Sequence, residues 1–271
     1  MRVGGCNVNH LEREMVELLK QGRDECGWVA AKAEFEAEGT RLDELNRLVE
    51  VVRRAGLRLA LKIGGCEALT DLYIARLTGA DYVIAPMIES GFALEKYRKS
   101  IVKAFSTNEL DDVAFLWNIE TIKGAQSLDE FQPQLGKSPV LAGAVFGRSD
   151  FAGSLGLDPD STDSEVVTNE VLAVSQWCSS QGIELVVGGG VSVRSVSVLR
   201  EIRAVNLARF ETRKVIFDAA CLDLDDSALE RGLLNALRFE LAWLENKARY
   251  YDGIVEQDRQ RISALKARWE L

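Results

Sequence analysis

Histidine is almost absent from this chain of 271 residues, in which His10 is the single one. Ser–His–Asp triads, histidine dyads and multi-histidine metal sites would all have to use that residue. Acid–base chemistry must otherwise come from carboxylates, lysines, a tyrosine or metal-bound water. The scarcity of histidine therefore excludes most site designs that depend on several imidazoles.

Cysteine is also scarce, and its spacing excludes two further classes of protein. The cysteines are odd in number, scattered and without a C-x-x-C pair, which is neither a disulfide framework nor a zinc site. We expect reduced thiols and a cytoplasmic location. The residues are Cys6, Cys26, Cys66, Cys178 and Cys221.

The chain lacks a basic surplus and a long apolar run. It has 33 lysine and arginine residues against 42 aspartate and glutamate residues, a formal net charge of −9. This balance argues against nucleic acid or an anionic membrane as partner, because both need a basic face, and it fits cation binding. No apolar run approaches the length that crosses a bilayer, and we expect no secretion signal.

Short apolar runs alternate with amphipathic stretches along the chain. The predicted strands are Trp28–Phe35, Leu57–Ile63, Asp81–Met87, Val113–Ile119, Val140–Phe146, Ile183–Val187 and Ala208–Phe217, with Arg2–Gly4 as a possible short first strand. The predicted helices between them include Arg41–Ala55, Glu67–Thr78, Phe92–Phe105, Ser164–Gln181 and Val193–Val205.

Repeated strand–helix units predict a parallel sheet with helices outside, and eight strands close a barrel. The alternative, an open doubly wound sheet, is disfavoured because no G-x-G-x-x-G follows the first strand. We therefore predict a (β/α)8 TIM barrel over residues 1–225, a length that one such barrel needs.

Residues 226–271 predict an extended C-terminal helical tail, with leucines at three- and four-residue steps. One interpretation is a last barrel helix on its own barrel. The other is an oligomer contact or a swapped helix, because the tail is longer than one barrel helix, and we expect a homo-oligomer. The leucines are Leu229, Leu233, Leu237, Leu241 and Leu244.

Two strands end in polar residues. FLWNIET (115–121) carries Asn118 and Glu120 at its end, and AGAVFGRSDFAGSLG (142–156) is a strand that opens into a glycine-rich turn carrying Asp150. Active sites of these barrels lie at the carboxyl ends of the strands, and consecutive strand ends are neighbours. Two carboxylates there suit a hard divalent cation, so Glu120 and Asp150 are predicted metal ligands.

This pair of motifs resembles the HpcH/HpaI aldolase and citrate lyase β-subunit family of the phosphoenolpyruvate/pyruvate superfamily, whose pattern is an I-E-T strand end followed by G-x-x-D-L-x-x-S-L-G. The second motif matches here with Phe151 at the usual leucine, and GADYVIAPMIESGFAL (79–94) is similar to the family's P-M-x-E-S/T strand. The matching residues are Gly147, Asp150, Ser154, Leu155 and Gly156.

The resemblance implies a (β/α)8 barrel in which Glu120 and Asp150 hold Mg²⁺ or Mn²⁺ and the ion chelates a 2-oxo acid. Backbone N–H groups around Arg148, Ser149 and Asp150 would then hold the substrate carboxylate, with Gly147 as a further substrate-binding residue, and Asn118 would orient the substrate. The ion would stabilise an enolate while an adjacent C–C bond forms or breaks with an aldehyde-like or acyl co-substrate.

The chain departs from the family at its acid–base residues. Lys62 stands where the family has an arginine, and it supplies the charge without the bidentate fork. A Schiff-base lysine is the alternative there. In WVAAKAEFEAEG (28–39), Glu34 matches the family glutamate, but Lys32 replaces the aspartate and Phe35 the histidine of its D-x-E-H motif. We keep Lys32, Glu34 and Lys62 as candidate catalytic residues.

Two later segments complete the candidates. VVGGGVSVRS (186–195) is a strand, three glycines and a helix start, so either a phosphate loop or a plain tight turn. In ARFETRKVIF (208–217), Arg213 either replaces the missing arginine or forms a structural ion pair with Glu211. Arg213 is therefore a fourth candidate catalytic residue.

These patterns together predict a metal-dependent carbon–carbon lyase or aldolase that acts on the enolate of pyruvate or a related 2-oxo acid. One alternative is a lyase for a CoA thioester of the citryl or malyl type. The other is a catalytically altered barrel that binds a 2-oxo acid or serves as an assembly subunit, since the usual dyad is missing.

Overall fold

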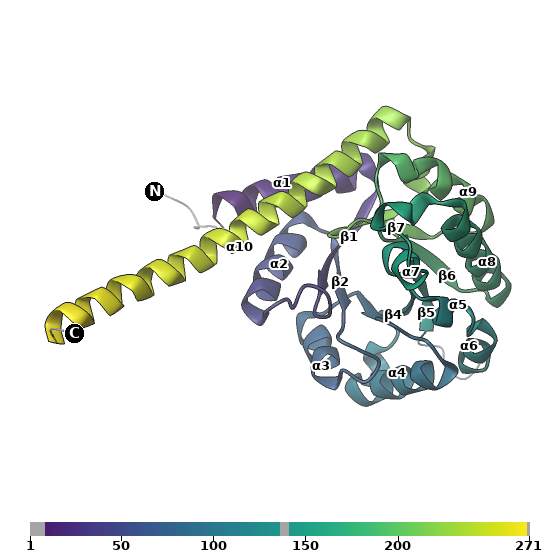
Figure 1. The fold of residues 1–271 in the computed structure, drawn as a ribbon, viewed down its shortest axis with the longest axis horizontal. Coiled ribbons are helices and arrows are strands. Elements are labelled where there is room, and N and C mark those ends of the chain that lie inside the picture. Colours follow the sequence, from purple (N-terminus) through teal and green to yellow (C-terminus); the bar gives the residue numbers. More distant parts are fainter. Residues whose placement is uncertain (1–8, 136–140, 270–271) are drawn as a thin grey trace.

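Eight strands form a closed barrel in the order in which they occur along the chain (Figure 1). The computed structural model describes residues 9–135 and 141–269, so Arg2–Gly4 lies outside the described residues. The predicted barrel is confirmed. The strands are β1 (Trp28–Glu34), β2 (Arg58–Lys62), β3 (Tyr82–Ala85), β4 (Ala114–Ile119), β5 (Leu141–Gly147), β6 (Glu184–Gly188), β7 (Arg209–Glu211) and β8 (Val215–Asp218).

Helices surround the barrel, and amphipathic stripes explain their place. In α2, for example, Leu45, Leu48 and Val52 are fully buried at helical spacing, and the helix ends at Gly56 with a φ of 71°. The helices are α1 (His10–Cys26), α2 (Leu42–Ala55), α3 (Leu69–Thr78), α4 (Gly91–Ala104), α5 (Ile122–Ala125), α6 (Leu128–Leu135), α7 (Arg148–Ser154), α8 (Glu165–Gln181), α9 (Val196–Asn206) and α10 (Asp226–Trp269), with 3-10 turns at Thr107–Glu109, Pro159–Asp163, Val193–Ser195 and Ala219–Asp223.

The predicted single strand over Ala208–Phe217 is wrong, because the chain reverses at residues 212–214 and forms a hairpin. β8 runs antiparallel to both β7 and β1, whereas the pairs from β1 through to β7 are parallel. The turn is closed by the Thr212 N–H, which donates to the Val215 carbonyl at 2.9 Å. A hairpin replaces the last crossover helix and still closes the barrel.

Side chains fill the barrel in layers. A middle layer is apolar and includes Ala30, Ala60, Leu116, Val145 and Val186, one from each of five strands. Because side chains alternate along a strand, the residues two positions further on also face inward. These next residues are Lys32, Lys62, Asn118, Gly147 and Gly188, so the layer at the carboxyl ends is polar or open.

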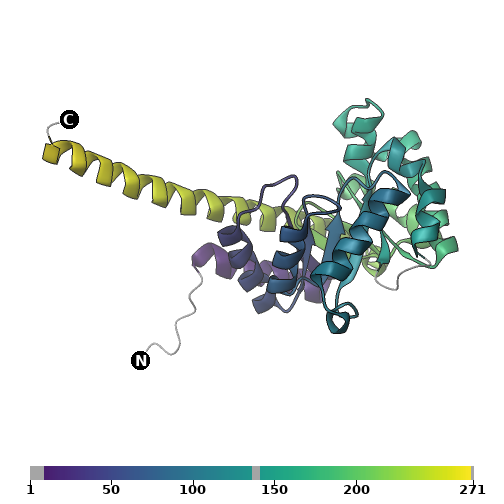
Figure 2. The same ribbon diagram turned by 90° about the horizontal axis from the view of Figure 1, so that it is seen from below.

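Helix α10 has two unlike parts. Its first part packs along α1, and Phe239 and Trp243 are buried there. Asn246 closes this contact, since its Oδ1 accepts a hydrogen bond from the Asn9 Nδ2 at 2.6 Å. The rest projects away from the barrel (Figure 2), and residues 252–269 are all exposed. No helix in the described ranges is long and apolar enough to cross a membrane.

Candidate active site

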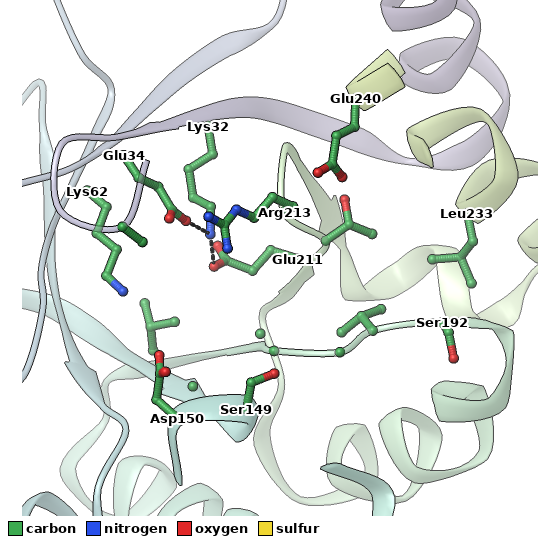
Figure 3. Close-up of a pocket in the computed structure, with 18 of the residues that line it drawn as sticks. Lys32, Glu34, Lys62, Ser149, Asp150, Ser192, Glu211, Arg213, Leu233 and Glu240 are labelled. Atoms are coloured by element: carbon green, nitrogen blue, oxygen red, sulfur yellow. Dashed lines mark hydrogen bonds and ion pairs between the residues drawn. The ribbon is translucent and has the colours of Figure 1, made fainter. Parts of the chain in front are cut away.

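A cavity of about 590 Å³ lies at the carboxyl ends of the parallel strands (Figure 3). Of the charged residues that line it, three are basic and seven are acidic. The cavity is therefore strongly negative before any ligand enters. The basic residues are Lys32, Lys62 and Arg213, and the acidic ones are Glu34, Glu36, Glu120, Asp150, Glu211, Glu230 and Glu240.

Glu120 is the carboxylate held most firmly in this cavity. It follows β4 directly and is only 2% exposed. Its Oε2 accepts hydrogen bonds from the Asn118 Nδ2 at 2.5 Å and from the Lys62 Nζ at 3.3 Å, and its Oε1 accepts one from the Met87 N–H at 2.8 Å. Burial raises the pKa of Glu120 above its ordinary value, against the lowering effect of Lys62.

The backbone around Glu120 is shaped to receive it. Met87 has a φ of 51°, in the left-handed region that is uncommon for a side chain of this kind, and this conformation accompanies its hydrogen bond to Glu120. On the other side, a Cβ on Gly147 would lie 2.8 Å from the Glu120 Cβ. Glycine is therefore required at position 147 for β5 to approach this carboxylate.

Asp150 lines the same cavity from the next strand end (Figure 3). The predicted glycine-rich turn is instead the short helix α7, with Asp150 in its first turn. The side chain is exposed to the cavity, and its negative charge is among the influences that raise the pKa of Glu120. The structure therefore brings the two predicted metal ligands to one cavity.

The donor atoms at this end of the cavity fit a hard divalent cation. Besides the two carboxylates, the buried Asn118 Oδ1 has no hydrogen-bond partner among the described residues. The described residues contain no cluster of three or more His, Cys, Asp or Glu side chains arranged for a metal. An ion bound by Glu120 and Asp150 would take its remaining oxygen ligands from water or substrate, as Mg²⁺ usually does.

Lys62 enters the cavity from the end of β2 and is 6% exposed. Its Nζ lies 3.1 Å from the Glu36 Oε2 and 3.3 Å from the Glu120 Oε2. Burial alone would lower the pKa of Lys62, but Glu120 and Glu36 outweigh burial and raise it. Lys62 is therefore a fixed cation near neutral pH, which suits charge stabilisation and not nucleophilic attack.

Lys32 lies between two buried carboxylates (Figure 3). Its Nζ is 2.9 Å from the Glu34 Oε1 and 2.5 Å from the Glu211 Oε1. Burial would lower the pKa of Lys32, yet Glu211 and Glu34 hold it above its ordinary value. The Glu211 Oε2 is buried without a partner among the described residues, so this ion triad keeps one free acceptor.

Arg213 lines the cavity from the β7–β8 turn, but it pairs with a carboxylate that does not line the cavity. Its Nε lies 3.2 Å from the Glu38 Oε1, and Lys214 also pairs with Glu38. Glu211 forms its ion pair with Lys32 from β1, and not with Arg213. Arg213 is half-exposed at the cavity edge, and any contact with substrate remains a prediction.

Arg148 points away from the cavity, beneath the glycine loop. It is fully buried, and it donates to the Gly189 carbonyl at 2.8 Å and to the Asp163 carboxylate at 2.5 Å. Its side chain therefore holds the loop, while Gly147 and Ser149 line the cavity. The predicted role of the backbone N–H groups here in binding a carboxylate remains a prediction.

The glycines of the loop 188–190 also line the cavity. Gly189 has a φ of 82°, and a Cβ there would lie 2.4 Å from the Ser149 N. Gly189 thus allows this loop to lie against the start of α7. Whether the loop binds a phosphate remains a prediction.

Helix α10 contributes a wall of the cavity that sequence reasoning did not identify. Leu233, Leu234, Leu237 and Glu240 all line it. The tail showed helical spacing of leucines, but nothing in that pattern indicates which end of the barrel it crosses. These cavity residues can be identified only from the packing of α10 against α1, which places the helix across this end of the barrel.

The comparisons with known proteins identify the fold. No family model and no curated protein matches the sequence. Solved structures do match in shape, among them an HpcH/HpaI aldolase from Desulfitobacterium hafniense DCB-2, with a TM-score of 0.59 and 16% identity over 75% of this chain and 83% of that one.

Two further structures agree with it. An HpcH/HpaI aldolase/citrate lyase family protein from Burkholderia cenocepacia J2315 has a TM-score of 0.57 and 13% identity, covering 90% of each chain. A variant of the citrate synthase SbnG has a TM-score of 0.52 and 15% identity, covering 86% of this chain and 90% of that one. The resemblance predicted from the NIET and GRSDFAGSLG motifs is thus confirmed at the level of fold.

Proposed function

We propose that this chain is a divergent HpcH/HpaI-type enzyme, a divalent-metal-dependent lyase or aldolase that forms or breaks a C–C bond through the enolate of pyruvate or a related 2-oxo acid. The observation that carries the proposal is the placement of Glu120 and Asp150 together in one acidic cavity. Mg²⁺ or Mn²⁺ suits their oxygen donors.

The charge of the cavity supports the need for a metal. A 2-oxo acid is an anion, and a cavity with seven acidic and three basic side chains repels it. A divalent ion reverses that balance locally and supplies a positive charge to the enolate oxygen. The proposed substrate class therefore depends on the proposed metal, because the acidic cavity would otherwise repel an anion.

The protein's own side chains have distinct tasks in this proposal. Lys62, a buried cation beside Glu120, stabilises negative charge that develops on the substrate. Asn118 donates to Glu120, and its buried Oδ1, unpartnered among the described residues, is left as an acceptor. Glu211 keeps its Oε2, unpartnered among the described residues, as an acceptor, and Glu34 with Glu211 fixes Lys32 in place.

One alternative has an observation in its favour. Lys32 is locked by two carboxylates in the place where the family resemblance expects an acid–base dyad, which favours a 2-oxo-acid-binding subunit without turnover. The acidic lining gives no support to the CoA-thioester alternative, because the CoA diphosphate is an anion. A cytoplasmic location still rests on the thiols, and Cys26, Cys66, Cys178 and Cys221 are free.

The experiment is deuterium exchange at the methyl group of pyruvate, followed by NMR in D₂O with and without added Mg²⁺ or Mn²⁺. We expect exchange that requires the metal and falls at least about 100-fold in Glu120→Gln and in Asp150→Asn, because a charge that stabilises the enolate is lost. Glu165→Gln, an exposed carboxylate at the start of α8, is the matched control and should retain the exchange rate.

Absence of exchange in the wild type, together with metal-dependent pyruvate binding by calorimetry, would favour the binding subunit. Exchange that survives in both variants would disprove the assignment of Glu120 and Asp150.

A further inference from the structure

The exposed face of α10 carries a second periodic pattern that differs from its packing face. Starting at Leu234, alternate steps of three and four residues reach Trp269 without a break, and we call these eleven positions the seam. Ten of them are apolar or aromatic, and Asp258 is the exception. A strict 3.5-residue period over about five heptads is the pattern of a coiled-coil interface.

Most of the seam is not packed within the chain; the exception is Tyr251, whose hydroxyl donates to the Glu44 Oε1 at 2.7 Å. The residues that pack on α1, such as Phe239 and Trp243, lie on another face of α10 and are buried. The seam residues Leu234, Leu237 and Leu241 are 46%, 52% and 50% exposed. Leucine side chains at regular spacing on an exposed helix face indicate a partner that covers them.

The second half of α10 needs such a partner to remain helical. Residues 252–269 are exposed throughout, and Figure 2 shows this segment projecting away from the barrel. An isolated helix of this length is only marginally stable in water, and most helix stability in proteins comes from packing an apolar face. The seam provides that face, with Val255, Ile262 and Leu265 along the projecting part.

The charges of α10 indicate which partner covers the seam and in which direction that partner runs. Residues 226–246 contain four acidic and two basic side chains, whereas residues 247–269 contain six basic and three acidic ones. Two copies of α10 placed side by side in parallel bring like charge against like charge. An antiparallel pair centred near residue 253 instead places residues 260–269, with three basic side chains, along residues 237–246, with two acidic and one basic.

We propose that two copies of this chain pair through an antiparallel coiled coil of their α10 helices, so that the free end of each helix reaches the cavity of the other copy. In the register that places Asp258 opposite Ala248, the smallest seam residue, the partner's Leu265 packs on Leu241 and the partner's Trp269 on Leu237. The same register places the partner's Arg268 beside Glu240.

This pairing makes the cavity a shared structure. Leu237 and Glu240 line its mouth and are the residues that the partner's helix end would cover. The partner's Arg268 would add a basic group to a cavity wall that is otherwise acidic. The pairing rests on the geometry and charge of α10 alone, so it stands or falls independently of the proposed chemistry.

The first test is the molar mass in solution, measured by light scattering after gel filtration of the full chain. We expect twice the chain mass of 30.0 kDa, or a multiple of that dimer. The double variant Leu241→Asp with Leu265→Asp places charges opposite each other in the seam and should give the monomer mass, with a loss of helical circular dichroism no larger than the projecting part of α10 accounts for. The matched control, Gln257→Asp with Gln260→Asp, lies off the seam and should remain dimeric.

The second test fixes the direction by disulfide trapping between two single variants, with the wild type as the background control. In the antiparallel register, Leu244 lies opposite the partner's Ile262. Leu244→Cys and Ile262→Cys should therefore cross-link when mixed and allowed to exchange subunits, while neither cross-links alone. A monomeric wild type, a dimer that survives the seam variant, or self-cross-linking of each single variant would overturn the proposal.

Discussion

At the scale of the residue, the decisive feature of the site is how its buried charges are paired. Lys32 is 5% exposed and is enclosed by Glu34 and Glu211, with both ion pairs within 2.9 Å. Buried ion pairs contribute little net stability compared with apolar packing, but removing one partner leaves an uncompensated charge. Lys32 thus supplies the cation that pairs with both buried carboxylates.

We expect Lys32→Met to lower the free energy of unfolding by about 3–5 kcal/mol at neutral pH, because Glu34 and Glu211 are then left buried without a cation. Urea denaturation followed by circular dichroism measures this change. Lys20→Met removes an exposed ion pair with Glu17 and is the matched control, with an expected change below about 0.5 kcal/mol.

The same charges predict how the stability of the wild type and the stability of Lys32→Met depend on pH. The pKa of Glu34 is lowered in the folded wild type: burial opposes the shift, and Lys32 outweighs it. This group therefore stabilises the fold above its ordinary pKa of 4.5, and the contribution is lost as the pH falls through the lower folded value.

In Lys32→Met we expect the pKa of Glu34 to shift in the opposite direction, because burial without the lysine raises it. The stability gap between wild type and variant should narrow between about pH 7 and about pH 4. A gap that is constant over this range would show that the triad does not control the ionisation of Glu34.

At the scale of the element, the site depends on how closely β5 approaches the end of β4. Gly147 is the last residue of β5 and faces Glu120, and a Cβ at this position would lie 2.9 Å from the Glu120 Oε2. Because neighbouring strands in a barrel are held in register by backbone hydrogen bonds, the clash must be relieved by moving Glu120.

Gly147→Ala should therefore weaken Mn²⁺ binding by about 10-fold or more and destabilise the fold by about 1–3 kcal/mol. Calorimetric titration and thermal unfolding measure the two effects. Gly153→Ala, in α7, is the matched control, because a Cβ there has nothing within 4 Å. Equal metal affinity in the two variants would contradict the close approach of Gly147 to Glu120 as a determinant of the site.

The β7–β8 hairpin is the element that departs most from a regular (β/α)8 barrel. Its turn, Thr212–Arg213–Lys214, contains no glycine, proline, asparagine or aspartate, so it carries none of the usual turn signals. Lys214 is buried against the Trp243 ring at 5.8 Å and pairs with Glu38. Contacts made with α10 and with the loop after β1 therefore stabilise this reversal.

At the scale of the whole molecule, the projecting part of α10 contributes little to the barrel core. Residues 254–269 are exposed along their full length, so their removal takes little apolar surface from the barrel core. The cavity-lining part of α10 lies upstream, between Glu230 and Glu240.

We expect deletion of residues 254–271 to leave a folded barrel whose thermal midpoint does not depend on protein concentration. The midpoint of the full chain should rise with concentration, because dimerisation stabilises the folded state by mass action. Scanning calorimetry over a range of concentrations measures both. A truncated chain with the same concentration dependence as the full chain would place the subunit contact elsewhere.

The sequence by itself determined the alternating strands and helices, because the period of apolar residues is a local property of the chain. It also predicted that Glu120 and Asp150 lie at one end of the barrel, because polar residues just after buried strands lie at the carboxyl ends of those strands in a parallel barrel. Both the barrel and the shared cavity of these two residues follow from these local rules.

The tertiary structure alone decided the partners of the charged side chains. Lys32 and Glu211 are 179 residues apart, and they meet because β8 reverses direction and closes the barrel between β7 and β1. Arg148 belongs to the same motif as Asp150, yet its side chain turns beneath the glycine loop and pairs with Asp163. Ion pairing depends on distances across the folded chain, and sequence spacing does not contain them.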